Sequence, residues 1–73
     1  MRCVYKMEDL ECAHCAAKME TKIAKLEGVN SVSVNFLSQK LTLDAQDSVF
    51  ESVLEEAVRI IRKIEPDCKV IIK

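Results

Sequence analysis

The chain has 73 residues, of which 49% are hydrophobic and 32% are charged, and its net charge at pH 7 is −1. This length allows about one sheet and two helices around one core, so residues 1–73 are expected to form a single domain. With one tyrosine, two phenylalanines and no excess of basic residues, the chain lacks the surfaces that nucleic-acid binding needs, and that class is set aside. No apolar run approaches the ~18 residues of a membrane span and no signal-peptide layout is present, so a soluble cytoplasmic chain without membrane insertion is expected.

The first part of the chain predicts a strand, a loop and a helix. Residues 2–8 alternate in character, as in a half-buried strand, and the inward residues are Cys3, Tyr5 and Met7. A loop over 9–14 leads to a helix expected over about 15–27, whose apolar residues recur at helical spacing. Gly28 is expected to end this helix, because glycine readily adopts positive φ.

The remainder predicts a hairpin, a second helix and a last strand. Residues 29–36 and 40–44 alternate on either side of a turn, so they are expected to pair as an antiparallel hairpin. Ser48 and Glu51 form a capping-box pattern at the start of a second amphipathic helix, which Pro66 ends. A strand over 68–72 completes the order β-α-β-β-α-β.

This order predicts an α+β fold. Right-handed crossovers place both helices on one face of a four-stranded antiparallel sheet, which is the ferredoxin-like sandwich. The loop after the first strand then projects at one end of the domain, where few neighbours bury it. The equivalent loop of the second half has no cysteine pair, so a single site of this kind is expected.

The projecting loop contains the motif Cys12-Ala13-His14-Cys15. Its two thiols converge on one small volume, and the free N–H groups and dipole of a helix start favour their thiolate forms. Four chemistries use such a pair: thiol-disulfide exchange, structural zinc, iron–sulfur ligation and reversible carriage of a soft metal.

The rest of the chain favours metal carriage. Structural zinc commonly needs a second ligand pair and an iron–sulfur cluster needs four thiolates, whereas this chain has one pair and a single histidine. Thiol-disulfide exchange remains an alternative, since His14 can stabilise a thiolate, although a thioredoxin-like fold needs a longer chain. An accessible pair with open coordination positions can bind a soft or borderline metal and hand it to an incoming ligand.

Within the predicted β-α-β-β-α-β order, the segment Leu10-Glu11-Cys12-Ala13-His14-Cys15 resembles the heavy-metal-associated domain of small copper chaperones and of the amino-terminal extensions of metal-transporting P-type ATPases. Leu26-Glu27-Gly28-Val29 and Val32-x-Val34-Asn35-Phe36 match the same family. In the family pattern Gly-Met-x-Cys-x-x-Cys, Cys12 and Cys15 stand at the metal ligands and Leu10 at the buried methionine that supports the loop. The resemblance implies a metal-binding module, not an enzyme, whose partner is a P-type ATPase in the same or a separate chain.

Departures from the family pattern bear on the metal. Asp9 replaces the glycine, and Glu11 replaces a small hydroxyl residue. Copper(I) is satisfied by two thiolates, whereas zinc, cadmium and lead prefer further ligands that include oxygen. We therefore predict that Cys12, Cys15 and Glu11 bind zinc, cadmium or lead, with a copper(I) chaperone as the alternative. The tail Ile64-Glu65-Pro66-Asp67-Cys68 also resembles cadmium/zinc ATPase amino-terminal domains.

Three other residues near the pair are weaker candidates. The ring of His14 is expected to point to solvent, although imidazole binds such metals well. Asp9 is an oxygen donor that can equally serve as a turn residue. Cys68 should begin its strand at the site end of the domain, but an inward free cysteine is usually a small buried hydrophobe, which is also our interpretation of Cys3.

Overall fold

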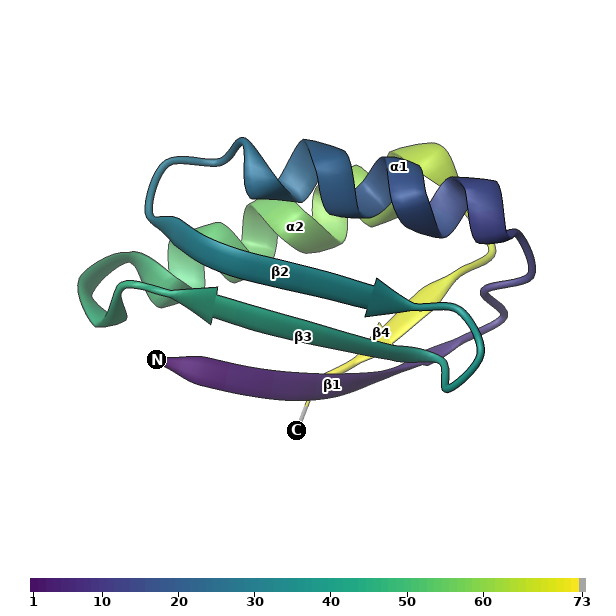
Figure 1. The fold of residues 1–73 in the computed structure, drawn as a ribbon, viewed down its shortest axis with the longest axis horizontal. Helices are drawn as coiled ribbons and strands as arrows, with labels where there is room; N and C mark the ends of the chain where they lie inside the picture. The colour runs from purple at the N-terminus through teal and green to yellow at the C-terminus, as the bar shows by residue number, and fades with distance from the viewer. Residues whose placement is uncertain (73) are drawn as a thin grey trace.

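The computed structural model describes residues 1–72 and contains a four-stranded antiparallel sheet with two helices on one face (Figure 1). The strands are β1 (Arg2–Glu8), β2 (Val29–Asn35), β3 (Lys40–Ala45) and β4 (Lys69–Ile71). The helices are α1 (Ala13–Ala24) and α2 (Phe50–Ile64), and a 3-10 turn, η1 (Asp47–Val49), precedes α2. The strand order is β2-β3-β1-β4, and β2 and β3 pair as an antiparallel hairpin. The predicted ferredoxin-like β-α-β-β-α-β fold is therefore confirmed.

Helix α1 is displaced toward the amino terminus relative to the prediction, which placed its start at Cys15 and its end at Glu27. It begins at Ala13 because Cys12 occupies the N-cap position, where its Sγ accepts a hydrogen bond from the Cys15 N–H at 3.3 Å. It ends at Ala24 because the chain then tightens into i→i−3 hydrogen bonds. Gly28, with φ 95°, then turns the chain into β2, as expected of glycine.

The predicted capping box at the second helix is wrong. Ser48 lies inside η1, and neither Gln46 nor Val49, the residues that precede η1 and α2, makes a side-chain capping bond. A backbone hydrogen bond from the Val49 N–H to the Gln46 carbonyl, at 3.1 Å, closes this turn instead. The helix ends at Ile64, ahead of Pro66 as predicted, and β4 is shorter than the expected strand over 68–72.

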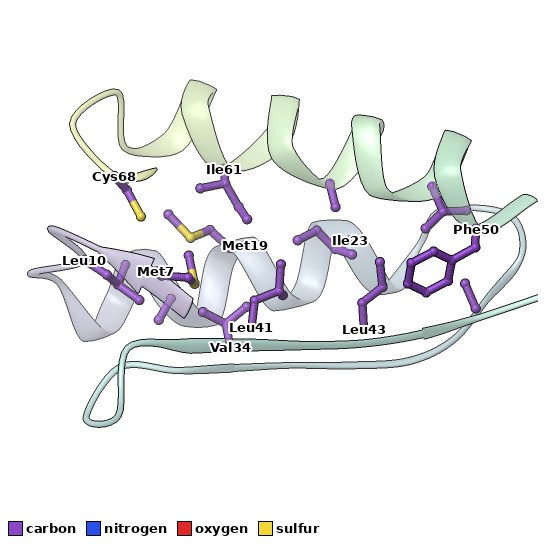
Figure 2. Packing of buried hydrophobic residues seen from close by; sticks show 14 residues of the cluster. Met7, Leu10, Met19, Ile23, Val34, Leu41, Leu43, Phe50, Ile61 and Cys68 are labelled. Carbon is purple, nitrogen blue, oxygen red and sulfur yellow. The ribbon is translucent and has the colours of Figure 1, made fainter. Parts of the chain in front are cut away.

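The core lies between the sheet and the two helices (Figure 2). The apolar positions predicted for α1 are buried at Ala16, Met19 and Ile23, and α2 contributes Phe50, Val53, Ala57 and Ile61. The sheet contributes Met7, Val34, Leu41, Leu43 and Ala45. Helices cover one face only, so outward strand residues such as Val4 remain exposed.

Strand β2 forms one edge of the sheet. Its Val34 N–H donates a hydrogen bond of 2.9 Å to the Glu20 carboxylate, which reaches across from α1. A backbone donor that would otherwise lack a partner at the edge is thereby satisfied.

Over the described residues, neither helix is long and apolar enough to cross a membrane.

Candidate metal site

Leu10 anchors the loop between β1 and α1 in the core, and Asp9, at the start of this loop, has a left-handed backbone conformation. Leu10 is only 2% exposed and belongs to the core, as predicted for the residue that supports the loop. Asp9 has φ 61°, a conformation that aspartate tolerates better than most residues and glycine adopts without steric cost. This geometry explains why a glycine suits the position in the family pattern and why Asp9 can replace it.

Gln39, from the turn between β2 and β3, fixes the backbone of the same loop. Its Oε1 accepts from the Leu10 N–H at 3.0 Å, and its Nε2 donates to the Leu10 carbonyl. The Gln39 carbonyl in turn accepts from the Met7 N–H at 2.8 Å. One side chain therefore satisfies both backbone groups of Leu10, and the path of the loop is set before the cysteines are reached.

The two cysteines lie at the start of α1, the helix entry at which the sequence predicted the pair. Cys12 is the N-cap residue, and the Cys15 N–H points at its Sγ. Both thiols are half-buried, and neither is in a disulfide. The pair is thus held on one side of the helix start while it remains accessible to an incoming ion.

The two thiols differ in acidity. The pKa of Cys12 is lowered, first by the hydrogen bond from the Cys15 side chain and then by the Cys15 backbone N–H. The pKa of Cys15 is raised to about 11, first by its hydrogen bond to Cys12 and then by burial and a hydrogen bond to Glu65. Cys12 is therefore the readier thiolate, and Cys15 keeps its proton until a metal or a base displaces it.

Glu65 is a site residue to which the sequence analysis assigned no role. It follows α2, where its backbone N–H donates to the Ile61 carbonyl at 2.9 Å and its carbonyl accepts from the Cys68 N–H at 3.0 Å. The half-buried side chain lies beside Cys15, whose pKa it raises. The resemblance of the tail that contains Glu65 to cadmium/zinc ATPase domains was the one available signal.

An acidic hollow of about 430 Å³ lies between the β1–α1 loop and the turn that follows α2. It is lined by Asp9, Glu11, Glu65, Pro66, Asp67 and Lys69. The predicted ligand Glu11 lies in its wall and is exposed, as is His14 on the helix. Within residues 1–72, no set of three or more histidine, cysteine or acidic side chains is already arranged around one point.

Cys68 lies at the site end of the domain, as expected, but it is 1% exposed and packs in the core with Met7 and Met19 (Figure 2). Its pKa is raised, chiefly by burial and further by the charges of Glu65 and Asp9. A protonated, buried thiol is a poor ligand. This placement supports the interpretation of Cys68 as a small hydrophobe, and Cys3 is partly buried against the same core.

The sequence matches the model of the heavy-metal-associated domain over residues 4–69. With the ferredoxin-like fold and the cysteine pair at the start of α1, this match shows that the chain belongs to the heavy-metal-associated domain family. The chain is therefore a metal-binding domain, as the sequence predicted.

Among curated proteins, the zinc/cadmium/lead-transporting P-type ATPase of Escherichia coli K12 is 39% identical over 56 residues. The alignment covers 73% of this chain and 8% of that protein. The cadmium-transporting ATPase of Staphylococcus aureus is 39% identical over 54 residues, covering 74% of this chain and 7% of that protein. The chain thus spans less than a tenth of the length of these relatives.

Among solved structures, the amino-terminal domain of a potential copper-translocating P-type ATPase from Bacillus subtilis, in its Cu(I)-loaded state, has a TM-score of 0.77 and 25% identity. The match covers 99% of this chain and 85% of that chain. A CopZ metallochaperone has a TM-score of 0.75 at 20% identity, covering 97% and 100% of the two chains, and this likeness supports the fold alone.

Proposed function

We propose that this domain binds one zinc, cadmium or lead ion through the Cys12 and Cys15 thiolates and a carboxylate. It then delivers the ion to a metal-exporting P-type ATPase, or regulates that ATPase, without catalysis of its own. In this proposal residues 1–73 act as one domain on the cytoplasmic side, either within the transporter chain or as a separate chaperone. The names of the two curated relatives described above, a zinc/cadmium/lead transporter and a cadmium transporter, support the choice of cargo.

The observation that carries the proposal is the carboxylate beside the thiols. Divalent zinc and cadmium prefer about four ligands and accept oxygen, whereas copper(I) gains little from a carboxylate. Glu65 already adjoins Cys15, and Glu11 borders the same hollow from the residue before Cys12. Of the two, we propose Glu65 as the better placed oxygen donor, with Glu11, the ligand that the sequence predicted, as its competitor.

The test is a competition titration of the reduced protein with zinc(II), cadmium(II) and copper(I), with chelators fixing each free metal concentration. We expect Glu65→Gln to weaken zinc and cadmium binding by about tenfold or more, about 1.4 kcal/mol, and to leave copper(I) unchanged. Glu11→Gln is measured in parallel, and Asp67→Asn removes a charge from the same hollow as the matched control.

Two results would count against this assignment. If Asp67→Asn weakened zinc binding as much as Glu65→Gln, the effect would be one of general charge and not ligation. If neither glutamate mattered for any metal, two sulfurs would suffice, and the copper(I) alternative would be favoured.

A copper(I) metallochaperone is the second candidate. Its support is the likeness to the Cu(I)-loaded domain from Bacillus subtilis, together with a thiol pair that could by itself hold a two-coordinate ion. It predicts a strong preference for copper(I) and indifference to both glutamate substitutions.

A further inference from the structure

The outer face of α2 carries a strip that the metal site does not use. A shallow groove of about 700 Å³ runs along it, lined by Glu51, Leu54, Glu55, Val58, Arg59, Arg62 and Ile72. Leu54 and Val58 are half-buried, and Ile72, which follows β4, is 52% exposed. The helical members recur three and four residues apart, so they lie on one face of the helix. The groove is therefore an apolar strip with a charged border.

The charges along this border are segregated by sign. Glu51 and Glu55 lie in the first half of α2, whereas Arg59 and Arg62 lie in the second half. All four are exposed. Arg59 contacts Glu56 at 3.1 Å, while across residues 1–72 no ion pair is found for Glu51, Glu55 or Arg62. The strip thus has an acidic half and a basic half that do not neutralise each other within one molecule.

We propose that this strip is a self-association surface on which the α2 helices of two copies of the chain pack antiparallel. A two-fold axis reverses the direction of the partner helix, so the acidic half of each copy faces the basic half of the other. The same symmetry brings Leu54 and Val58 of both copies together near the axis. A parallel arrangement would instead place like charges opposite each other, which is unfavourable.

This geometry keeps the dimer separate from the metal site. The carboxyl end of α2 lies at the same end of the domain as the β1–α1 loop (Figure 1). In an antiparallel pair the two cysteine loops therefore point to opposite ends of the dimer, and both stay accessible. Because the apolar strip is short, we expect weak association, with dissociation constants between high micromolar and millimolar.

The experiment measures self-association of the reduced protein in the presence of a chelator, by NMR diffusion and amide shifts from micromolar to millimolar concentration. The shifts should map to α2 and Ile72. Arg62→Glu and Glu51→Arg should each weaken dimerisation by at least about fivefold, because every substitution acts twice in a symmetric pair. An equimolar mixture of these two variants should dimerise again, because each mixed pair restores opposite charges.

Lys63→Glu is the matched control, since it makes the same charge change in the same helical turn outside the groove. A protein that stays monomeric at millimolar concentration would overturn the proposal, as would a mixture that fails to recover. Equal effects of Lys63→Glu and Arg62→Glu would also overturn it. A Cys12→Ser/Cys15→Ser variant should dimerise like the wild type, so this test and that of the metal site fail independently.

Discussion

The segments that enter the two helices are held in different ways. Between β1 and α1, the side chain of Gln39 bonds both backbone groups of Leu10, and Cys12 caps the helix. Between β3 and α2, a 3-10 turn with no side-chain cap makes the connection, and its Asp47 contacts the Met1 ammonium group at 2.7 Å. The first segment is fixed by a half-buried glutamine side chain from another turn. The second is held by backbone hydrogen bonds, one of them from the Gln46 N–H to the Gly28 carbonyl, and by an exposed ion pair.

This difference shows how the fold can expose reactive groups without leaving them mobile. The cysteine pair is accessible, yet the backbone before it is anchored by a core leucine and a glutamine from another turn. Such anchoring holds ligands near their binding geometry before the metal arrives, which lowers the ordering cost of binding. The entry to α2 is held through its backbone, including a hydrogen bond of 3.0 Å from the Gln46 N–H to the Gly28 carbonyl, and has no thiols to position.

Removing both thiols should have the largest effect. We expect Cys12→Ser/Cys15→Ser to lower affinity for zinc and cadmium by more than about 100-fold, beyond the loss typical of an outer-shell partner. The fold should persist, because serine is also a good N-cap residue. Chelator competition measures the affinity and circular dichroism the fold. Retention of wild-type affinity would exclude the pair as the metal site.

The affinity of the cysteine pair for metal should depend on pH. At a pH between the lowered pKa of Cys12 and the pKa of about 11 of Cys15, Cys12 is a thiolate and Cys15 is still a thiol. The metal must then displace the Cys15 proton. Apparent affinity should therefore rise by about tenfold for each unit increase in pH, and more steeply below the pKa of Cys12, where two protons leave. Chelator-buffered titrations across neutral and alkaline pH measure this slope. An affinity independent of pH would contradict the assignment.

Gln39→Ala tests the anchoring itself. It removes the polar partners of a buried backbone segment, so the free energy of unfolding should fall by about 1–3 kcal/mol. Metal affinity should fall as well, because the loop loses its fixed path. Urea denaturation and metal competition report the two effects. If stability falls while affinity is unchanged, the hydrogen bonds of Gln39 serve the fold alone.

Ser48→Ala should have the smallest effect and is the counterpart in the second segment. Since Ser48 makes no capping bond there, stability should change by no more than about 0.5 kcal/mol. Urea denaturation measures the change. A loss of about 1 kcal/mol or more would mean that the capping box predicted from the sequence does form in solution.

Periodicity was sufficient to predict the fold. Alternation assigned the inward faces of the strands, and helical spacing identified the buried residues of α1, because both patterns follow from burial on one side. Gln39 was missed because it acts on Leu10 across 29 positions of sequence, which no local pattern reports. The capping box failed because the chain enters α2 through η1, which contains Ser48, so Ser48 is not the residue that precedes the helix.

The candidate site was only partly accessible from the sequence. The cysteine motif identified the thiol pair, and its place at the start of a helix was inferred from the helical spacing of the apolar residues that follow it. Glu65 reaches Cys15 only through the packing of α2 and its following turn against α1. Its contact is tertiary, so the sequence offered Glu11, the adjacent carboxylate, in its place.

The bond between Glu20 and Val34 bears on how this chain avoids polymerisation. Exposed edge strands present free N–H groups on which a strand of another molecule can add, the first step of sheet growth between molecules. On β2, the Glu20 carboxylate occupies one of these donors and adds a negative charge beside the edge. An incoming strand would have to displace a charged hydrogen bond at that point. Helix α1 therefore positions the cysteines at its start and, through Glu20 further along, opposes the strand addition that begins fibril formation.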